Sequence, residues 1–160
     1  MGVEDSMKPY FAVAVLPFVL ALAACSSSDD SGDSGGPVKT TPLAGDIDGH
    51  PFAAKSALVR KDRDDANVYD VTIFDREVTC DNDPGFTDYM VFLDVKDWAS
   101  GLSYNLDLDH AVTLFMREGN LNLISVKGRV EVDASGQSLR VRADSGRGAI
   151  EGQVPVQICK

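Results

Sequence analysis

The residues best suited to acid–base chemistry in this 160-residue chain are its two histidines, because each follows an acidic stretch. His50 comes after the acidic turn at residues 46–49, and His110 comes after the sequence Leu-Asp-Leu-Asp at residues 106–109. A histidine that is aligned by a carboxylate and lies next to a serine could catalyse hydrolysis. No H-E-x-x-H zinc motif, phosphate-binding loop or dinucleotide fingerprint accompanies them. We therefore assign no catalytic residue and no cofactor, and a hydrolase is the second alternative function.

The acidic turns also contain the oxygen ligands that calcium prefers. Asp46, Asp48, Asp81 and Asp83 are the candidate ligands, in the sequences Asp-Ile-Asp-Gly and Asp-Asn-Asp-Pro-Gly. Neither sequence has the glycine and the later glutamate of an EF-hand loop in register. Because ordinary turns also use aspartate, asparagine and glycine, we expect turns here and no metal site.

The aromatic side chains could line a cavity for a small apolar ligand, or they could form a simple hydrophobic core. The candidate lining residues all lie after residue 50: Phe52, Tyr69, Phe74, Tyr89, Phe92, Trp98, Tyr104 and Phe115. Trp98, Tyr104 and Phe92 are the candidates for direct ligand contact. A large internal cavity would favour a lipocalin-like carrier, and a packed interior would argue against one.

The N-terminal segment has the composition of an export signal. Translation from Met7 would place Lys8 at the positive end, followed by an apolar stretch at residues 11–21. This stretch has about eleven residues, which suits the h-region of a signal peptide and is too short to cross a bilayer comfortably. It is followed closely by Cys25 and then by serine, aspartate and glycine.

The sequence Leu22-Ala23-Ala24-Cys25 resembles the lipobox of bacterial lipoproteins. The resemblance implies cleavage between Ala24 and Cys25 and attachment of a diacylglyceryl group to the Cys25 thiol. The serine that follows resembles that of lipoproteins sent to the outer membrane. Two or three acyl chains would anchor the protein stably, whereas one would not. We therefore expect export and lipid anchoring to the outer membrane, with an ordinary secretory signal as the alternative.

The composition divides the chain into three regions. Residues 1–25 are the expected signal peptide, and residues 26–42 are rich in serine, aspartate, glycine, threonine and proline. That second composition buries too little apolar surface to offset the entropy of ordering, so we expect a disordered tether. Residues 43–160 are long enough to fold as one β domain.

Two further cysteines, Cys80 and Cys159, remain once Cys25 is assigned to the anchor. An even pair in an oxidising compartment favours a disulfide, and two unpaired thiols are the alternative. On the chain-entropy model, closing so long a loop would stabilise the fold by about 4–5 kcal/mol. The bridge would fix the C-terminal strand against the loop at residues 75–88.

The hydrophobic pattern of the domain has a period of two, which is typical of antiparallel strands with one wet face. Apolar residues alternate with polar ones at residues 69–73, 104–108, 139–143 and 150–158. The sequence Tyr-Met-Val-Phe-Leu-Asp-Val at residues 89–95 is apolar on both faces, which predicts a central strand. The β-branched and aromatic content of residues 110–118 favours a strand over a helix.

Turn residues separate these segments and define a C-terminal meander of three or four strands. Asp48-Gly49 predicts a hairpin turn near the start of the domain. Ile124, Val126, Val130 and Val132 keep one phase across a glycine, which predicts one long strand bent there. We expect an all-β fold of about eight to ten strands, either an antiparallel sandwich or a small barrel.

The charge of the chain excludes one class of partner. The formal net charge is −10, and the few basic residues are scattered among acidic ones. Nucleic-acid binding requires a basic surface that neutralises phosphates, so we expect no nucleic-acid partner.

These observations lead to one hypothesis about function. The opening at Gly45, Ile47, Gly49 and Phe52, with a cysteine near the end, is similar to that of small all-β lipoproteins of unassigned function. We expect a membrane-anchored envelope lipoprotein whose non-enzymatic β domain serves interaction or envelope structure. A lipocalin-like carrier of a small apolar ligand is the alternative.

Overall fold

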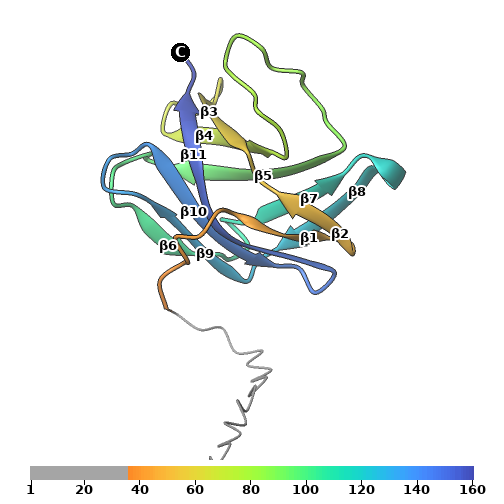
Figure 1. Cartoon of the computed structure of the whole chain (residues 1–160). Helices are drawn as coiled ribbons and strands as arrows, with labels where there is room; N and C mark the ends of the chain where they lie inside the picture. The colour runs from red at the N-terminus through yellow and green to blue at the C-terminus, as the bar shows by residue number, and fades with distance from the viewer. Residues whose placement is uncertain (1–35) are drawn as a thin grey trace, which may run out of the picture. The chain divides into compact units, whose positions relative to one another are not determined.

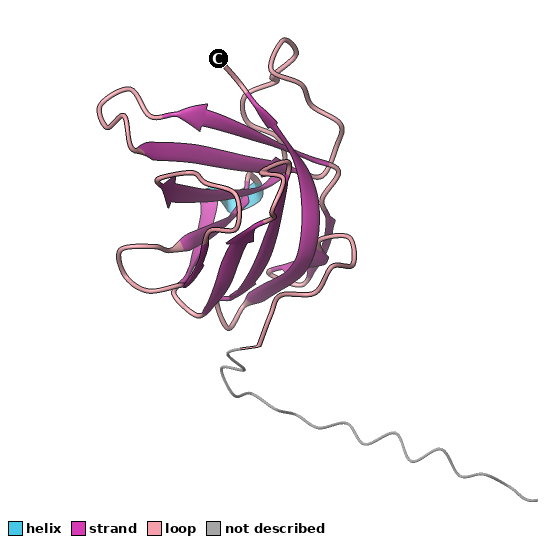
Figure 2. Ribbon diagram, turned by 90° about the vertical axis from the view of Figure 1, so that its left-hand side faces the viewer, coloured by secondary structure: helices cyan, strands magenta, loops and turns pink. Residues whose placement is uncertain are grey.

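The computed structural model describes residues 36–160, which form a curled, almost entirely β structure (Figures 1 and 2). The predicted signal peptide and Cys25 lie outside the described residues. In chain order the strands are β1 (Ala44–Ile47), β2 (His50–Ala53), β3 (Ser56–Lys61), β4 (Val68–Phe74), β5 (Tyr89–Lys96), β6 (Ser103–Asn105), β7 (Val112–Met116), β8 (Leu121–Ser125), β9 (Gly128–Val132), β10 (Ser138–Asp144) and β11 (Gly148–Ile158). A single 3-10 turn at Glu118–Asn120 joins β7 to β8.

The strands form one curled sheet in the order β6-β9-β10-β11-β3-β4-β5-β7-β8, with the β1–β2 hairpin added at β11. We call the part containing β6, β9, β10, β1 and β2 sheet A, and the part containing β3, β4, β5, β7 and β8 sheet B. The strand β11 belongs to both parts and curls the sheet into a half-barrel. The all-β prediction is therefore confirmed, and the eleven strands slightly exceed the expected number.

The long strand β11 changes partners part of the way along its length. Its first half pairs with β10 and with β1, and residues 156–158 pair in parallel with β3. Gly152 lies in the part that pairs with β10, at φ 142°, and a Cβ there would lie 2.6 Å from both Leu43 Cα and the Thr41 carbonyl oxygen. A glycine is therefore required where the N-terminal segment crosses β11.

The predicted C-terminal meander is present, because β9, β10 and β11 are consecutive antiparallel neighbours. The hairpin at Asp48-Gly49 is also confirmed, since β1 pairs with β2 across that turn. Strand β5 lies between β4 and β7, as its apolar sequence predicted. The parallel pairing of β11 with β3 departs from the antiparallel expectation.

The prediction of one long strand across Gly128 is wrong. Strand β8 pairs with β7 in sheet B, whereas β9 pairs with β10 in sheet A, so the chain passes between sheets at residues 126–127. Gly128 has φ 136°, and a Cβ there would lie 1.9 Å from the Arg142 carbonyl oxygen. The glycine serves this close approach of β9 to β10 and does not bend a continuous strand.

The concave side of the curled sheet contains the main core. Buried apolar residues from both sheets pack there in one cluster, which includes Ala57 and Val59 on β3 and Val141 on β10. Alternate residues of each strand point into this cluster, as the period of two predicted.

A second apolar cluster covers part of the convex face of sheet B. Leu58, Phe74, Met90 and Phe115 point outward there and are buried beneath the loop at residues 75–88, through its Val78. This explains why β5 is apolar on both faces. The loop is fastened by the Cys80–Cys159 disulfide, which confirms that the two thiols are bonded.

Residues 36–42 lie against sheet A, although the sequence placed them in the tether. The Val38 side chain is 2% exposed, and Thr41 and Leu43 exchange backbone hydrogen bonds with Gln153 of β11. The packed part of the chain therefore begins before the expected boundary at Leu43. Composition alone did not indicate this, because one apolar side chain and polar contacts with distant strands hold the segment.

Candidate functional site

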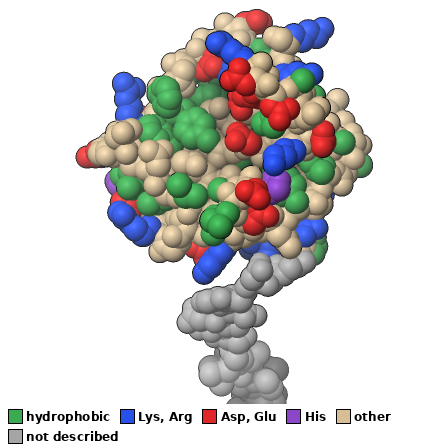
Figure 3. Space-filling model, turned by 180° about the vertical axis from the view of Figure 1, so that it is seen from behind, with side chains coloured by type: hydrophobic (Ala, Val, Ile, Leu, Met, Phe, Trp, Pro, Cys, Tyr) green, Lys and Arg blue, Asp and Glu red, His purple; other side chains and the backbone are tan. Residues whose placement is uncertain are grey.

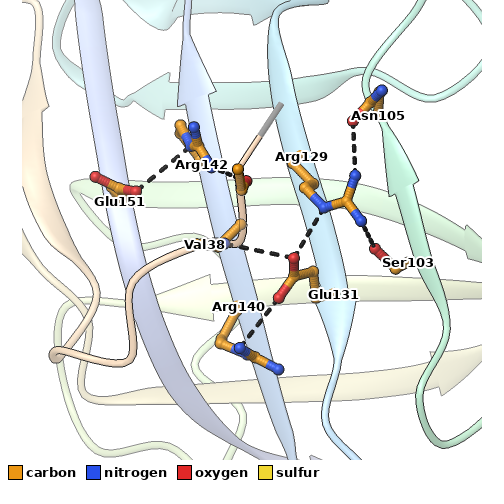
Figure 4. A network of polar contacts seen from close by, with 9 residues as sticks. Val38, Ser103, Asn105, Arg129, Glu131, Arg140, Arg142 and Glu151 are labelled. Carbon is orange, nitrogen blue, oxygen red and sulfur yellow. Dashed lines mark hydrogen bonds and ion pairs between the residues drawn. The ribbon is translucent and has the colours of Figure 1, made fainter. Parts of the chain in front are cut away.

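The convex face of sheet A carries a ladder of charged side chains (Figure 4). Glu131 lies at its centre, is 7% exposed, and bonds to Arg129 at 2.8 Å and to Arg140 at 3.1 Å. Arg129 also donates to side-chain oxygens of Ser103 and Asn105 on β6. The alternating strand pattern places these groups on the face opposite the core, where opposite charges on adjacent strands stabilise the sheet.

The N-terminal segment crosses this ladder and uses its charges (Figure 4). The Val38 backbone N–H donates to Glu131 Oε1 at 3.4 Å, and Arg142 Nη2 donates to the Gly36 carbonyl oxygen at 2.6 Å. Lys39 Nζ lies 2.6 Å from Glu151 Oε2. The ladder thus holds the point at which the chain enters the domain, and we assign it a structural role.

His110 is the better placed of the two histidines for acid–base chemistry. Its Nδ1 lies 3.0 Å from Asp107 Oδ1, and its ring packs 5.1 Å from that of Tyr104. The hydrogen bond from His110, with backbone N–H groups of Asp109 and His110, lowers the pKa of Asp107 below its usual range. Burial raises the pKa of the Tyr104 hydroxyl, so that it stays protonated and donates to the Asp94 carbonyl oxygen.

Neither histidine is joined to a nucleophile in the part of the chain that the structure describes. His50 is exposed and packs 5.6 Å from the ring of Tyr89. Within residues 36–160, no serine, threonine or cysteine side chain is hydrogen-bonded to either imidazole. The pair formed by Asp107 and His110 therefore closes a turn, and the hydrolase alternative gains no support from it.

The four calcium candidates do not converge. Asp46 accepts a hydrogen bond from the Gly49 N–H, and Asp48 pairs with the Arg147 guanidinium at 2.8 Å. Asp83 pairs with Arg60 at 2.7 Å and accepts from the Gly85 N–H, while Asp81 is exposed beside the disulfide. Among the described residues, no cluster of three or more acidic, histidine or cysteine side chains could hold a metal ion.

The three candidates for ligand contact lie on opposite faces of the sheet. Trp98 and Tyr104 pack against the main core, and Trp98 lies 6.4 Å from the ring of Tyr69. Phe92 instead points to the convex face of sheet B. A hollow of about 230 Å³ lies at the ends of β5 and β7, lined by Asp88, Tyr89, Met116 and Glu118, and contains none of the three.

Phe92 belongs to a group of three packed aromatic rings, in which Phe86 is exposed, Phe92 is half-buried and Phe115 is buried. Phe86 lies 6.2 Å from Phe92 and 5.7 Å from Phe115, and those two rings lie 5.8 Å apart. Phe86 is 65% exposed, although it is large and apolar. On the next strands of the sheet, Phe92 is paired with Thr113 of β7, and Thr113 is paired with Ile124 of β8. Ile124 is also an exposed apolar residue, with 63% of its surface accessible. We call Phe86, Phe92 and Phe115 the aromatic patch.

Two acidic residues follow the aromatic patch in the register of the sheet, and Figure 3 shows acidic side chains beside an apolar area on one face of the molecule. Asp94 follows Phe92 by two residues on β5, so both point to the convex face, and Asp94 is directly opposite Asp70 on β4. Partial burial, and then the charges of Asp94 and Asp62, raise the pKa of Asp70. Within residues 36–160 neither Asp70 nor Asp94 forms an ion pair.

Several contacts hold the loop that carries Phe86. The disulfide joins it to the end of β11, and Gln157 accepts a hydrogen bond from the Cys80 N–H at 3.0 Å. Ser56 on β3 accepts from the Val78 N–H and donates to the Arg76 carbonyl oxygen. The ion pair between Arg60 and Asp83 fixes the loop just before Phe86. The aromatic patch is therefore preorganised.

The sequence pattern identified Phe92 and Phe115 as aromatic candidates, whereas it missed Phe86, Asp70 and Asp94. A usable signal existed for Phe86, because a large apolar residue directly follows Pro84-Gly85 in an acidic loop. Asp70 and Asp94 become neighbours only through the register of β4 and β5.

Comparison with known protein families, with curated proteins and with solved structures gives no match for this chain. Residues 36–160 contain no helix long and apolar enough to cross a membrane.

Proposed function

We propose that this protein is a bacterial envelope lipoprotein, anchored through lipid on Cys25, whose β domain is a non-enzymatic interaction module. The lipobox-like sequence supports the anchor, and the preorganised aromatic patch supports the interaction role. The patch carries the proposal, because an exposed aromatic side chain, Phe86, packed on two further rings and held by a fastened loop is typical of a protein-binding surface.

The arrangement of the chain ends is consistent with this role. The described chain enters along sheet A at one end of the domain, and the C terminus lies at the other end (Figure 1). The disulfide holds the loop at residues 75–88 next to the C terminus. An anchored domain would therefore present that loop away from its point of attachment.

The two alternatives receive less support. A carrier requires an internal cavity, whereas buried apolar side chains from both sheets pack together on the concave side. A hydrolase requires a nucleophile beside its base, and His110 pairs with Asp107 and Tyr104 instead.

The anchor is tested by expressing the full chain and its Cys25→Ser variant in a bacterium supplied with radiolabelled palmitate. We expect label on the wild-type protein alone, with the wild type in the outer-membrane fraction and the variant released into the periplasm. An unlabelled wild-type protein, or a variant equally bound to the membrane, would contradict the proposed anchor.

A further inference from the structure

We propose that the aromatic patch and the neighbouring pair Asp70 and Asp94 form one docking surface for a cationic polypeptide segment, in which aromatic or aliphatic side chains alternate with lysine or arginine. This inference rests on the proposed interaction role and specifies the chemistry of the partner. The surface lies on the convex face of sheet B, and no sequence motif indicated that these residues lie together there.

The first argument is the exposure of the apolar part. Phe86 is 65% exposed, and it contacts both Phe92 and Phe115 on the sheet. A large apolar side chain held in water by a fastened loop gains stability only when a partner covers it. The rings also offer edges and faces to an incoming aromatic or cationic group.

The second argument is the charge beside the patch. Asp70 and Asp94 are directly opposite each other on adjacent strands, where like charges destabilise a sheet. The basic residue nearest in register is Arg60, opposite Asp70 on β3, and its guanidinium is engaged with Asp83 at 2.7 Å. Lys96, two residues beyond Asp94, forms no ion pair among the described residues. The carboxylate pair therefore remains available to a positive charge from outside.

The third argument is the spacing of the two parts. Phe92 and Asp94 are two residues apart on one strand, and their side chains therefore lie roughly 7 Å apart on the same face. An extended segment with an apolar and a basic side chain at that spacing would engage the aromatic patch and the carboxylates together. The formal net charge of −10 would also attract a cationic partner over longer distances.

The test uses the full chain purified in detergent and a fluorescein-labelled peptide, acetyl-Lys-Trp-Lys-Leu-Lys-Trp-Lys-amide. Binding is followed by fluorescence anisotropy at two salt concentrations, and the control peptide has glutamate at each lysine position. We expect saturable binding of the lysine peptide that weakens with salt, and no binding of the glutamate peptide.

The variants separate the two parts of the surface. Asp70→Asn combined with Asp94→Asn should weaken binding by about fivefold, and Phe86→Ser by about tenfold. Leu108→Ser, at an apolar residue that is 89% exposed in another loop, should leave binding unchanged. Asp64→Asn combined with Asp109→Asn makes the same change in net charge elsewhere and should also have no effect.

Three results would overturn the inference. The first is absence of saturable binding, and the second is equal binding by the wild type and the variant lacking both carboxylates. The third is a wild-type dimer in sedimentation that Phe86→Ser abolishes and the peptide does not disrupt, which would assign the surface to a second copy of the chain. Loss of lipid from Cys25 would not alter any of these readouts, so failure of the anchor and failure of the docking surface are distinguishable.

Discussion

At the scale of single residues, the acidic side chains fall into two groups according to their surroundings. Asp107 and Asp133 accept hydrogen bonds from His110 and from Ser135 respectively, and also from backbone N–H groups, so their pKa values are lowered. Desolvation, and then the carboxylate of Asp94 on the adjacent strand, raise the pKa of Asp70. The first group stabilises turns as carboxylates, whereas ionised Asp70 destabilises the sheet that carries it.

This difference predicts that Asp70→Asn stabilises the protein at neutral pH by about 0.5 kcal/mol, because it removes a like-charge pair across two strands. The pKa of Asp70 is higher in the folded chain than its ordinary value of 3.8. Protonated Asp70 therefore contributes to the stability of the folded protein below pH 3.8. This contribution is lost as the pH rises through the folded pKa and Asp70 ionises. Urea unfolding should show the gain at pH 7 and little gain near pH 3.

Asp64→Asn serves as the matched control, because that aspartate lies in the exposed turn before β4 and is not opposite another carboxylate. An equal gain in both variants would show that overall charge, and not the Asp70–Asp94 register, sets the effect. A stabilised Asp70→Asn variant that binds the cationic peptide less well would also exclude unfolding as the cause of weaker binding.

At the scale of elements, the loop at residues 75–88 acts as a cover for the convex face of sheet B. It buries Leu58, Phe74 and Met90, which would otherwise expose a large apolar area. Its attachment depends on the disulfide to β11 and on Ser56 of β3. The same loop places Phe86 at the edge of the covered area, so stability and the docking surface share one element.

Replacing both Cys80 and Cys159 by serine should lower the free energy of unfolding by about 4 kcal/mol, because the bridge closes a loop with a sequence separation of 79. The loss is measured by urea unfolding of the oxidised protein and of the variant. We also expect weaker peptide binding, since Phe86 would lose its fixed position.

Reduced wild-type protein provides the control for this prediction and should match the serine variant. A loss below about 1 kcal/mol would mean that the loop contacts, and not the covalent link, hold the cover in place.

At the scale of the whole molecule, the two faces of the curled sheet have different roles. The convex face of sheet A receives the incoming segment at residues 36–42 on a charged ladder, and Glu131 is buried beneath it. The convex face of sheet B carries the cover loop, the aromatic patch and the acidic pair. The domain therefore separates the face that receives the chain from the face that we propose binds a partner.

This arrangement predicts that the incoming segment contributes to stability. Val38→Asp should lower the free energy of unfolding by about 2–3 kcal/mol, because it places a carboxylate at a position that is 2% exposed and beside Glu131. Thr40→Asp, two residues away at an exposed position, should change it by less than about 0.5 kcal/mol. Equal effects of the two substitutions in urea unfolding would mean that residues 36–42 do not belong to the folded unit.

Much of the fold could be predicted because local patterns carry it. The period of two at residues 139–143 and 150–158, separated by turn residues, defined the meander before any contact was known. The prediction failed at Gly128, where the phase of apolar residues continued although the chain changed sheets. Periodicity reports which face of a strand is apolar, and it contains no information about which strand lies alongside.

The candidate site was less predictable than the fold, for the same reason. Aromatic residues at positions 92 and 115 were visible in the sequence, and Phe86 was conspicuous in its acidic loop, but no local pattern indicated that Phe86 would pack against the other two rings. Asp70 and Asp94 belong to different strands and face each other only through their register.

The sequence by itself determined the all-β class and the main turns, and it favoured a disulfide between the remaining cysteines and a lipid anchor, because each depends on neighbouring residues or on residue counts. Only the tertiary structure decided that β11 links two sheets, that residues 36–42 pack on the domain, and that three aromatic rings lie beside two carboxylates. These features arise from contacts between residues distant in the chain, and such contacts are set by the packing of the whole sheet.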